Sequence, residues 1–256
     1  MIRPTLALSL MSLLSASAFG ATLAHRYSFD GNTADTVGGN TGVLLNGATV
    51  SSTHLVLPGT GSGAGAANMG FTNIVGIGSN FGASGVTIES WYTDNNSGTW
   101  AKLFTFGTST AGQELAWTNI RGGGDLAPGL DRNGVHFLSG YPAGSNTRLS
   151  TGAEHHLVVS VASDGTTDLW VDGTQQITGK ATNALSNVVS STESIGATAW
   201  GDPGHNGTVN EFRIWSGPMT NSEVTRNFSL GPNVVPEPVS IALVGLGLLG
   251  ILRRRR

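Results

Sequence analysis

Residues 155–173 read HHLVVSVASDGTTDLWVDG, and this stretch decides the fold class. Side chains from His155 to Ala162 alternate between two faces, which is typical of a β-strand. A second strand candidate covers Thr167–Val171, and each strand is followed by an Asp-Gly pair, Asp164-Gly165 or Asp172-Gly173. Asp-Gly tolerates the positive φ that tight hairpin turns need. The stretch therefore predicts consecutive antiparallel strands of an all-β fold.

The same strand signals recur along the rest of the chain. Long alternating segments cover residues 23–30, 86–93 and 208–215, and shorter candidates cover 43–45, 54–57, 101–106, 135–138 and 194–196. Alternation in the first segment predicts that four side chains share one face: Leu23, His25, Tyr27 and Phe29. One short helix is expected at residues 220–228, because Thr220-Asn221-Ser222-Glu223 has the pattern of a capping box.

Composition narrows the class of protein. The chain has 256 residues, 38 Gly and no Cys, and 11% of its residues are charged, against about 25% in a typical globular domain. Such a composition suits an exported, loop-rich β protein. The lack of Cys excludes a disulfide scaffold, a thiolate zinc site and a Cys nucleophile. The formal net charge of −3 excludes a strongly basic nucleic-acid binder, so no nucleic-acid partner is expected.

The two ends of the chain differ from its body. Residues 1–21 contain Arg3, an apolar run from Leu6 to Leu14 and a small-residue exit, which together predict the helix of a secretory signal peptide. Near the C-terminus, a second apolar run covers residues 239–252. As a helix this run would be about 21 Å long. It is short for a hydrocarbon core of about 30 Å, unless flanking residues snorkel or the bilayer thins.

Residues 232–256 carry a more specific pattern. Pro236-Glu237-Pro238 precedes the apolar run, and four basic residues follow it: Arg253, Arg254, Arg255 and Arg256. This order of parts resembles the PEP-CTERM sorting signal; the alternative is a generic C-terminal membrane anchor. The resemblance implies an exosortase-type sorting enzyme as partner, a Gram-negative bacterium, and a transient anchor in the inner membrane through residues 239–252. The exported protein would then be released to the cell surface or the exopolysaccharide matrix.

The body of the chain, residues 22–231, resembles the laminin-G-like, concanavalin A-like jelly-roll sandwich in its bacterial form. The markers follow one another in the family's order: residues 25–30, 45–48, 86–91, 155–158 with 169–173, and 210–215 with the short helix. Glu154 departs from the family, which usually has Trp before the paired histidines. The resemblance implies one jelly-roll domain between the signal peptide and the sorting tail.

Calcium is the metal ion that this body would attract. Five of the 13 basic residues and one of the 16 acidic residues lie in the two ends, so the body keeps 8 basic and 15 acidic residues, a net charge of −7. The resemblance implies that the first and last strands lie close together. Asp30, with Asp35 nearby, would then meet Asn210 or Glu211, and these oxygens would hold one structural Ca²⁺. The alternative is that Asp30 and Asp35 only cap turns through their own backbone.

A loop near the C-terminal end of the body supplies the candidate ligand-binding residues: Trp200, Asp202, His205 and Asn206. A loop Trp can stack on a sugar ring through its apolar face. Trp100 and Trp117 also have turn-like surroundings, but Trp200 is the preferred exposed candidate, and packing in the core is the alternative for each Trp. His155 and His156 are neighbours on a strand and therefore point to opposite faces. We do not expect these two imidazoles to share a metal ion.

The sequence predicts no catalytic residues. Glucanases of this fold carry Glu-x-Asp-x-x-Glu on one strand, and this sequence has no Glu-x-Asp. We therefore expect a non-catalytic binding or adhesion module whose partner is an extracellular polysaccharide or a surface protein. The alternatives are a structural matrix protein without a small ligand and a divergent glycan-degrading enzyme.

Overall fold

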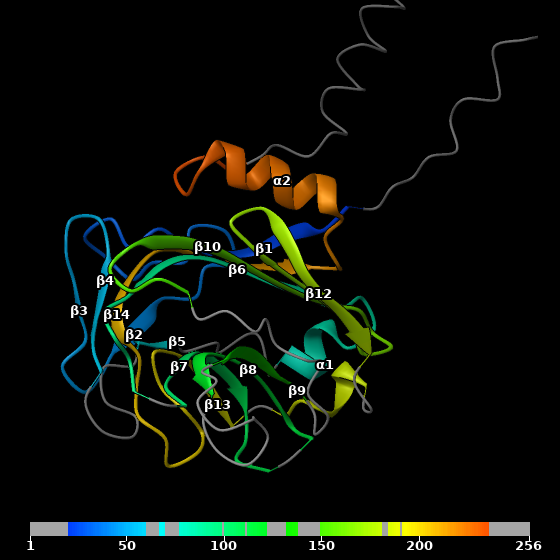
Figure 1. The fold of residues 1–256 in the computed structure, drawn as a ribbon, viewed down its shortest axis with the longest axis horizontal. Helices are drawn as coiled ribbons and strands as arrows, with labels where there is room; N and C mark the ends of the chain where they lie inside the picture. Colours follow the sequence, from blue (N-terminus) through cyan, green and yellow to red (C-terminus); the bar gives the residue numbers. More distant parts are fainter. Residues whose placement is uncertain are drawn as a thin grey trace, which may run out of the picture.

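The computed structural model describes residues 20–59, 67–69, 77–98, 100–110, 112–121, 132–137, 149–180, 184–189 and 191–235. The described residues form two antiparallel β-sheets packed face to face, with one helix across the outer side of the larger sheet (Figure 1). This sandwich confirms the predicted β architecture. The apolar runs of the expected signal peptide and sorting tail lie outside the described residues. Within those residues, no helix has the length and apolar character to cross a membrane.

The larger sheet has eight strands in the order β12-β11-β10-β6-β14-β4-β3, and β1 also pairs with β14. The stretch that decided the fold class forms two neighbouring strands of this sheet, β10 and β11, and the turn that leads into β12. The strands are β1 (Thr22–Tyr27), β3 (Thr49–Val50), β4 (Leu55–Pro58), β6 (Val86–Asp94), β10 (Glu154–Val161), β11 (Thr166–Val171), β12 (Thr174–Lys180) and β14 (Asn206–Ser216).

The smaller sheet has six strands in the order β2-β5-β13-β7-β8-β9. They are β2 (Gly42–Leu44), β5 (Ala67–Met69), β7 (Lys102–Gly107), β8 (Glu114–Arg121), β9 (Arg132–Phe137) and β13 (Thr192–Ile195). Three short helical segments complete the described structure: α1 (Ile77–Phe81), the 3-10 helix η1 (Leu185–Asn187) and α2 (Asn221–Leu230).

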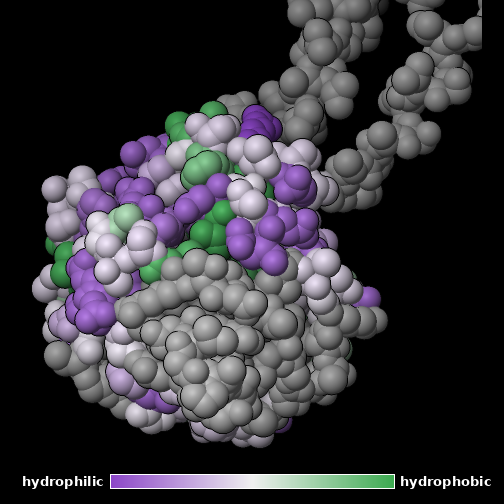
Figure 2. Space-filling model, viewed as in Figure 1, coloured by the Kyte–Doolittle hydropathy of each residue, from purple (hydrophilic) through white to green (hydrophobic). Residues whose placement is uncertain are grey.

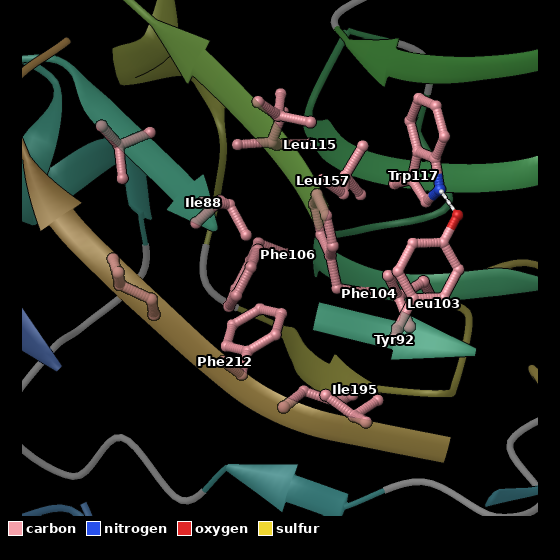
Figure 3. Close-up of a cluster of buried hydrophobic side chains, with 14 of the residues drawn as sticks. Ile88, Tyr92, Leu103, Phe104, Phe106, Leu115, Trp117, Leu157, Ile195 and Phe212 are labelled. Atoms are coloured by element: carbon pink, nitrogen blue, oxygen red, sulfur yellow. Dashed lines mark hydrogen bonds between the residues drawn. The ribbon is translucent and has the colours of Figure 1, made fainter. Parts of the chain in front are cut away.

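The main core lies between the two sheets and follows the alternation of the strands. Phe104 of β7 meets Phe212 of β14 edge to face, with ring centroids 5.9 Å apart, and Figure 3 shows them among the buried side chains of both sheets. Trp117 of β8 donates its indole N–H to Tyr92 Oη of β6 at 3.2 Å. This bond joins the two sheets and satisfies a polar group inside the core. Burying each such large side chain contributes about 1.5–3 kcal/mol.

A second apolar cluster lies on the outer side of the larger sheet, beneath α2. We call it the outer cluster; its buried members are Val158, Trp170, Trp215, Met219 and Val224. The side chains of Ala21, Leu23 and Val235 pack against it. The outer cluster therefore receives residues from both ends of the described chain as well as from α2.

The expected facing of the first strand is wrong in one respect. Leu23 packs against the outer cluster, whereas Tyr27 and Phe29 lie in the main core. The cause is a register shift against β14 between Leu23 and His25, a β-bulge that the strand pattern does not reveal. The strand also ends at Tyr27, before the expected Asp30, and Phe29 adopts a φ of 52°.

Turn and cap residues behave as the sequence predicts. Asp172 and Gly173 both have positive φ, 49° and 73°, in the two-residue turn between β11 and β12. Thr220 and Glu223 form both hydrogen bonds of a capping box at the start of α2. The helix runs to Leu230, two residues past the expected end, and stops where Gly231 takes a φ of 76°.

Candidate functional site

Trp200 is the exposed aromatic residue of the loop that joins β13 to β14. The residue is 37% exposed. Its Nε1–H donates a hydrogen bond of 2.7 Å to Glu114 Oε2 of β8, and its backbone N–H donates to Thr198 Oγ1 at 3.0 Å. Since Leu115 and Trp117 point into the core, Glu114 lies on the outer face of the smaller sheet. The indole is thus fixed over that face with part of its surface open to solvent.

Glu114 is buried beneath the indole. Burial raises the pKa of its carboxyl group to about 7, although the Trp200 hydrogen bond and the Lys102 charge oppose this rise. The pKa of an unperturbed Glu is near 4.5. The carboxyl group can therefore carry or release a proton near neutral pH while it holds Trp200.

A buried lysine lies on the same face. The Lys102 side chain is fully buried, and its Nζ lies 3.3 Å from Asp202 Oδ2 and donates to the Trp100 carbonyl oxygen at 3.2 Å. Nζ also lies 5.3 Å from the centroid of the Trp100 ring. The Asp202 side chain keeps 29% of its surface exposed. Lys102 thus holds in place a carboxylate that is still open to solvent near Trp200.

His205 and Asn206, the other two predicted ligand residues, hold the loop in place. His205 is 1% exposed, its Nε2 donates to the Thr93 carbonyl oxygen at 3.3 Å, and its Nδ1 lies 3.2 Å from Ser97 Oγ. Burial lowers the pKa of this imidazole, so the ring is neutral at pH 7. Asn206 donates its side-chain amide to the Asn95 carbonyl oxygen. The structure therefore leaves Trp200 and Asp202 at the surface and turns His205 inward.

The four predicted calcium ligands do not fit a calcium ion. The Asp35 carboxylate lies 2.6 Å from His25 Nδ1 and accepts backbone N–H groups, including those of Arg26 and Gly38. His25 and these N–H groups hold the pKa of Asp35 at about 2, against the effect of burial. Such donors occupy the oxygens that Ca²⁺ would need.

The other three side chains have separate surroundings. Glu211 is bound by Arg26 and Arg213, Asn210 donates to Glu154, and Asp30 is exposed. In the part of the chain that the structure describes, no three His, Cys, Asp or Glu side chains are grouped to hold a metal ion.

The paired histidines point to opposite faces, as expected from their positions on β10. His156 is buried, stacks on Trp91 with ring centroids 4.2 Å apart, and bonds to Glu89 at 2.9 Å. His155 lies 2.8 Å from Asp172 Oδ2 through Nδ1 and 2.9 Å from Ser150 Oγ through Nε2. The Asp172 hydrogen bond raises the pKa of His155. The imidazolium can then donate from both nitrogens, and it ties residue 150 to the β11–β12 turn.

Sequence reasoning missed the buried polar network on the outer side of the larger sheet. Glu89 is fully buried and accepts hydrogen bonds from Trp215 Nε1 at 2.9 Å and Asn227 Nδ2 at 3.0 Å, besides its bond with His156. Arg213 binds Glu89 and Glu211, and its guanidinium lies 4.7 Å from the Trp91 ring centroid.

The network favours the charged form of the Glu89 carboxylate. Burial alone would raise the pKa of Glu89, but the His156 hydrogen bond and the Arg213 charge outweigh burial and lower it. The available sequence signal was Glu89, a charged residue within the otherwise β-favouring segment 86–94. Its partners come from β10, β14 and α2, which no local pattern brings together.

Two family models match the chain. One, described as the concanavalin A-like lectin/glucanases superfamily, matches residues 70–225, and the other, the PEP-CTERM protein-sorting motif, matches residues 234–256. No curated protein matches the chain. Strands β1 to β5 precede the first matched region but belong to the same two sheets.

Solved structures share the fold at low sequence identity. Domain 4 of AbnA, a GH43 extracellular arabinanase from Geobacillus stearothermophilus in complex with arabinotriose, matches at 19% identity and a TM-score of 0.57, covering 81% of this chain and 98% of that domain. Trypanosoma rangeli sialidase matches at 16% identity and a TM-score of 0.56, covering 80% of this chain. This chain spans 32% of the sialidase.

Proposed function

Because this chain belongs to the concanavalin A-like lectin/glucanases superfamily and ends in a PEP-CTERM protein-sorting motif, we propose that it is an exported glycan-binding module of the cell surface or exopolysaccharide matrix. An exosortase-type enzyme would process the sorting tail. The domain would then act by recognition on a rigid β scaffold, without chemistry of its own. The supporting observation is the arrangement around Trp200.

Trp200 offers the features of a sugar-stacking residue. Its partly open indole presents an apolar face, and the bond to Glu114 fixes its orientation before any ligand arrives. Asp202 supplies a partly exposed carboxylate that can accept hydrogen bonds from sugar hydroxyls. Contacts that are already in place lower the entropy cost of binding.

The preferred ligand is an uncharged or basic polysaccharide. The body of the chain has a net charge of −7, and the Trp200 surface adds the Asp202 carboxylate, so a polyanion would be repelled. The AbnA domain is described in complex with arabinotriose, which makes neutral oligosaccharides a reasonable first set of probes.

One observation favours a second candidate, a divergent glycan-cleaving enzyme. Glu114, with its pKa near 7, and the Asp202 carboxylate influence each other electrostatically, and glycosidases pair a protonated acid with an ionised one. Against this, Glu114 is only 4% exposed and one of its oxygens accepts the Trp200 N–H. We therefore place binding first.

A glycan array separates these functions. The full chain in detergent would be applied with and without Ca²⁺, beside Trp200→Ala and a matched control, Val37→Ala, which truncates another exposed apolar residue. We expect binding to a neutral or basic glycan that falls at least tenfold in the Trp200 variant and is unchanged in the control. Absence of binding to every glycan would overturn the proposal. Release of reducing sugar, lost in Glu114→Gln, would favour the enzyme.

A further inference from the structure

Arg213 holds the segment that leads into the sorting motif. Its Nη2 donates hydrogen bonds to the carbonyl oxygens of Pro232 and Val234, at 2.5 and 3.3 Å. The side chain of Val235 packs against the outer cluster. The next residue, Pro236, begins the Pro-Glu-Pro part of the motif. The chain is therefore fixed to the domain surface up to the residue before Pro-Glu-Pro.

This attachment is built on the buried network. Arg213 is fully buried, and its other guanidinium nitrogens bind Glu89 and Glu211. Removing a partner from a buried ion pair is strongly unfavourable. The carbonyl groups of residues 232 and 234 are thus bound to a rigid group of the sheet.

The N-terminal end of the domain lies on the same side. Ala21 packs against the outer cluster together with Val235. A side chain at Gly20 would overlap the Glu223 carboxylate, which places Gly20 beside the first turn of α2. Both ends of the domain therefore leave from the face that carries α2 (Figure 1).

Only a short piece of chain separates this face from the apolar run of the tail. Residues 236–238 lie between Val235 and the run that begins at Val239. Three fully extended residues span at most about 10 Å. The polar headgroup layer on each side of a bilayer is itself roughly 5–7 Å thick. Once residues 239–252 enter a membrane, this short piece of chain keeps the α2 face close to the membrane surface.

Exposed apolar side chains gather at this exit. Phe228 is 42% exposed, Leu230 38% and Val234 46%. Figure 2 shows hydrophobic surface among hydrophilic atoms at the top of the molecule, where α2 lies in Figure 1. Such side chains suit the boundary between headgroups and acyl chains, and they carry an energetic cost in water.

We propose that, until its tail is processed, the domain rests on the bilayer with the α2 face down, where Phe228, Leu230 and Val234 contact the lipid. This inference rests on the sorting function proposed above, because that function places residues 239–252 in the membrane. The occupant of the α2 face is the lipid surface. After processing, the same face would be free.

The chain has no Cys, so a single reporter can be placed anywhere without a competing thiol. Leu230→Cys and Val234→Cys would carry an environment-sensitive fluorophore on the α2 face. Val43→Cys is the matched control, since Val43 is also exposed but belongs to β2 of the smaller sheet. The full chain would be reconstituted in phosphatidylethanolamine/phosphatidylglycerol vesicles that contain lipids bearing a nitroxide quencher.

We expect the fluorophores at 230 and 234 to lose more than half of their emission and the one at 43 to lose little. Inserting 20 Gly/Ser residues between Val235 and Pro236 should restore at least half of the lost emission. If the chain floats with the vesicles but the fluorophores at 43 and 230 are quenched equally, the docking proposal is overturned. A chain that does not float overturns both the membrane insertion and the docking. Glycan binding is a separate measurement and is unaffected by either result.

Discussion

Trp200 and Glu114 form a pair in which a partly exposed indole N–H donates to a buried carboxyl group at 2.7 Å. They come from the loop after β13 and from β8, 86 residues apart in sequence. The pair joins the candidate ligand surface to the rigid outer face of the smaller sheet. Its energy depends on whether Glu114 carries a proton.

Glu114→Gln should remove a pH-dependent loss of stability. Because burial raises the pKa from 4.5 to about 7, the folded state binds this proton more tightly than the unfolded chain. The resulting stabilisation is complete below about pH 4.5 and is lost as the pH rises through 7. Such a shift corresponds to at most about 3 kcal/mol. Urea unfolding should give the variant similar stability to the parent at pH 4.5 and higher stability at pH 8. Equal stabilities at pH 8 would contradict a raised pKa of Glu114 in the folded state.

Glu89→Gln should be strongly destabilising, by about 3–5 kcal/mol, because it leaves Arg213 buried without its full set of charged partners. Glu154→Gln is the matched control, since the Glu154 side chain is 37% exposed. The control should change the free energy of unfolding by less than about 0.5 kcal/mol. Urea unfolding at pH 7 measures both, and similar values for the two variants would contradict a stabilising network.

Asp172→Asn should weaken the domain most near pH 5.5. The His155 hydrogen bond and the backbone N–H of His156 lower the pKa of Asp172 below 3.8, against burial, and Asp172 raises the pKa of His155 above 6.5. The aspartate contribution is complete above pH 3.8 and is lost as the pH falls through its lowered pKa. The histidine contribution is complete below pH 6.5 and is lost as the pH rises through its raised pKa.

Both groups are charged between these limits, so we expect a loss of about 1 kcal/mol at pH 5.5 and a smaller loss at pH 9.5. Thermal unfolding at the two pH values measures the difference. Asp168→Asn, on β11, provides the control, because the partly exposed Asp168 carboxylate accepts a hydrogen bond from the Gln175 side-chain amide, which carries no charge. An equal loss at both pH values would mean that the His155–Asp172 pair acts without its charge.

Removing divalent cations should leave the domain unchanged. The oxygens of Asp35 and Glu211 are occupied by N–H donors rather than directed toward a common centre. A melting curve in excess EDTA should therefore overlay the curve in millimolar CaCl₂ within about 1 °C. A rise of several degrees on adding calcium would demonstrate a bound ion that stabilises the folded state.

Local sequence patterns predicted most of the strands, because alternation and tight turns depend only on residues that are neighbours in sequence. Alternation and the Asp-Gly turns located β10 and β11, and the capping box located α2. Four strands were not predicted: β3 and β5 have only two and three residues, and the residues of β8 and β12 lack the same contrast between faces. The bulge after Leu23 was also beyond prediction, because it depends on the register against β14.

The site depended on contacts that are distant in sequence. The exposure of Trp200 was predicted from its turn-like surroundings. His205 has similar surroundings but is buried, because its backbone N–H bonds to Gly196 and its ring meets Tyr92. Arg26 and Glu211, 185 residues apart, pair because β1 lies beside β14. Only the assembled sheet determines which charges neutralise one another.

Ala21 and Val235, at the two ends of the described domain, both lie at the outer cluster beneath α2, which makes the two sides of the domain different. Trp200 lies over the smaller sheet, whereas Ala21 and Val235 meet at the outer side of the larger one. While the tail holds the domain at the membrane, the candidate recognition surface around Trp200 would lie on the side away from the bilayer. Once the tail is processed, the α2 face that had contacted lipid would be exposed to the matrix and would provide a second surface for contacts there.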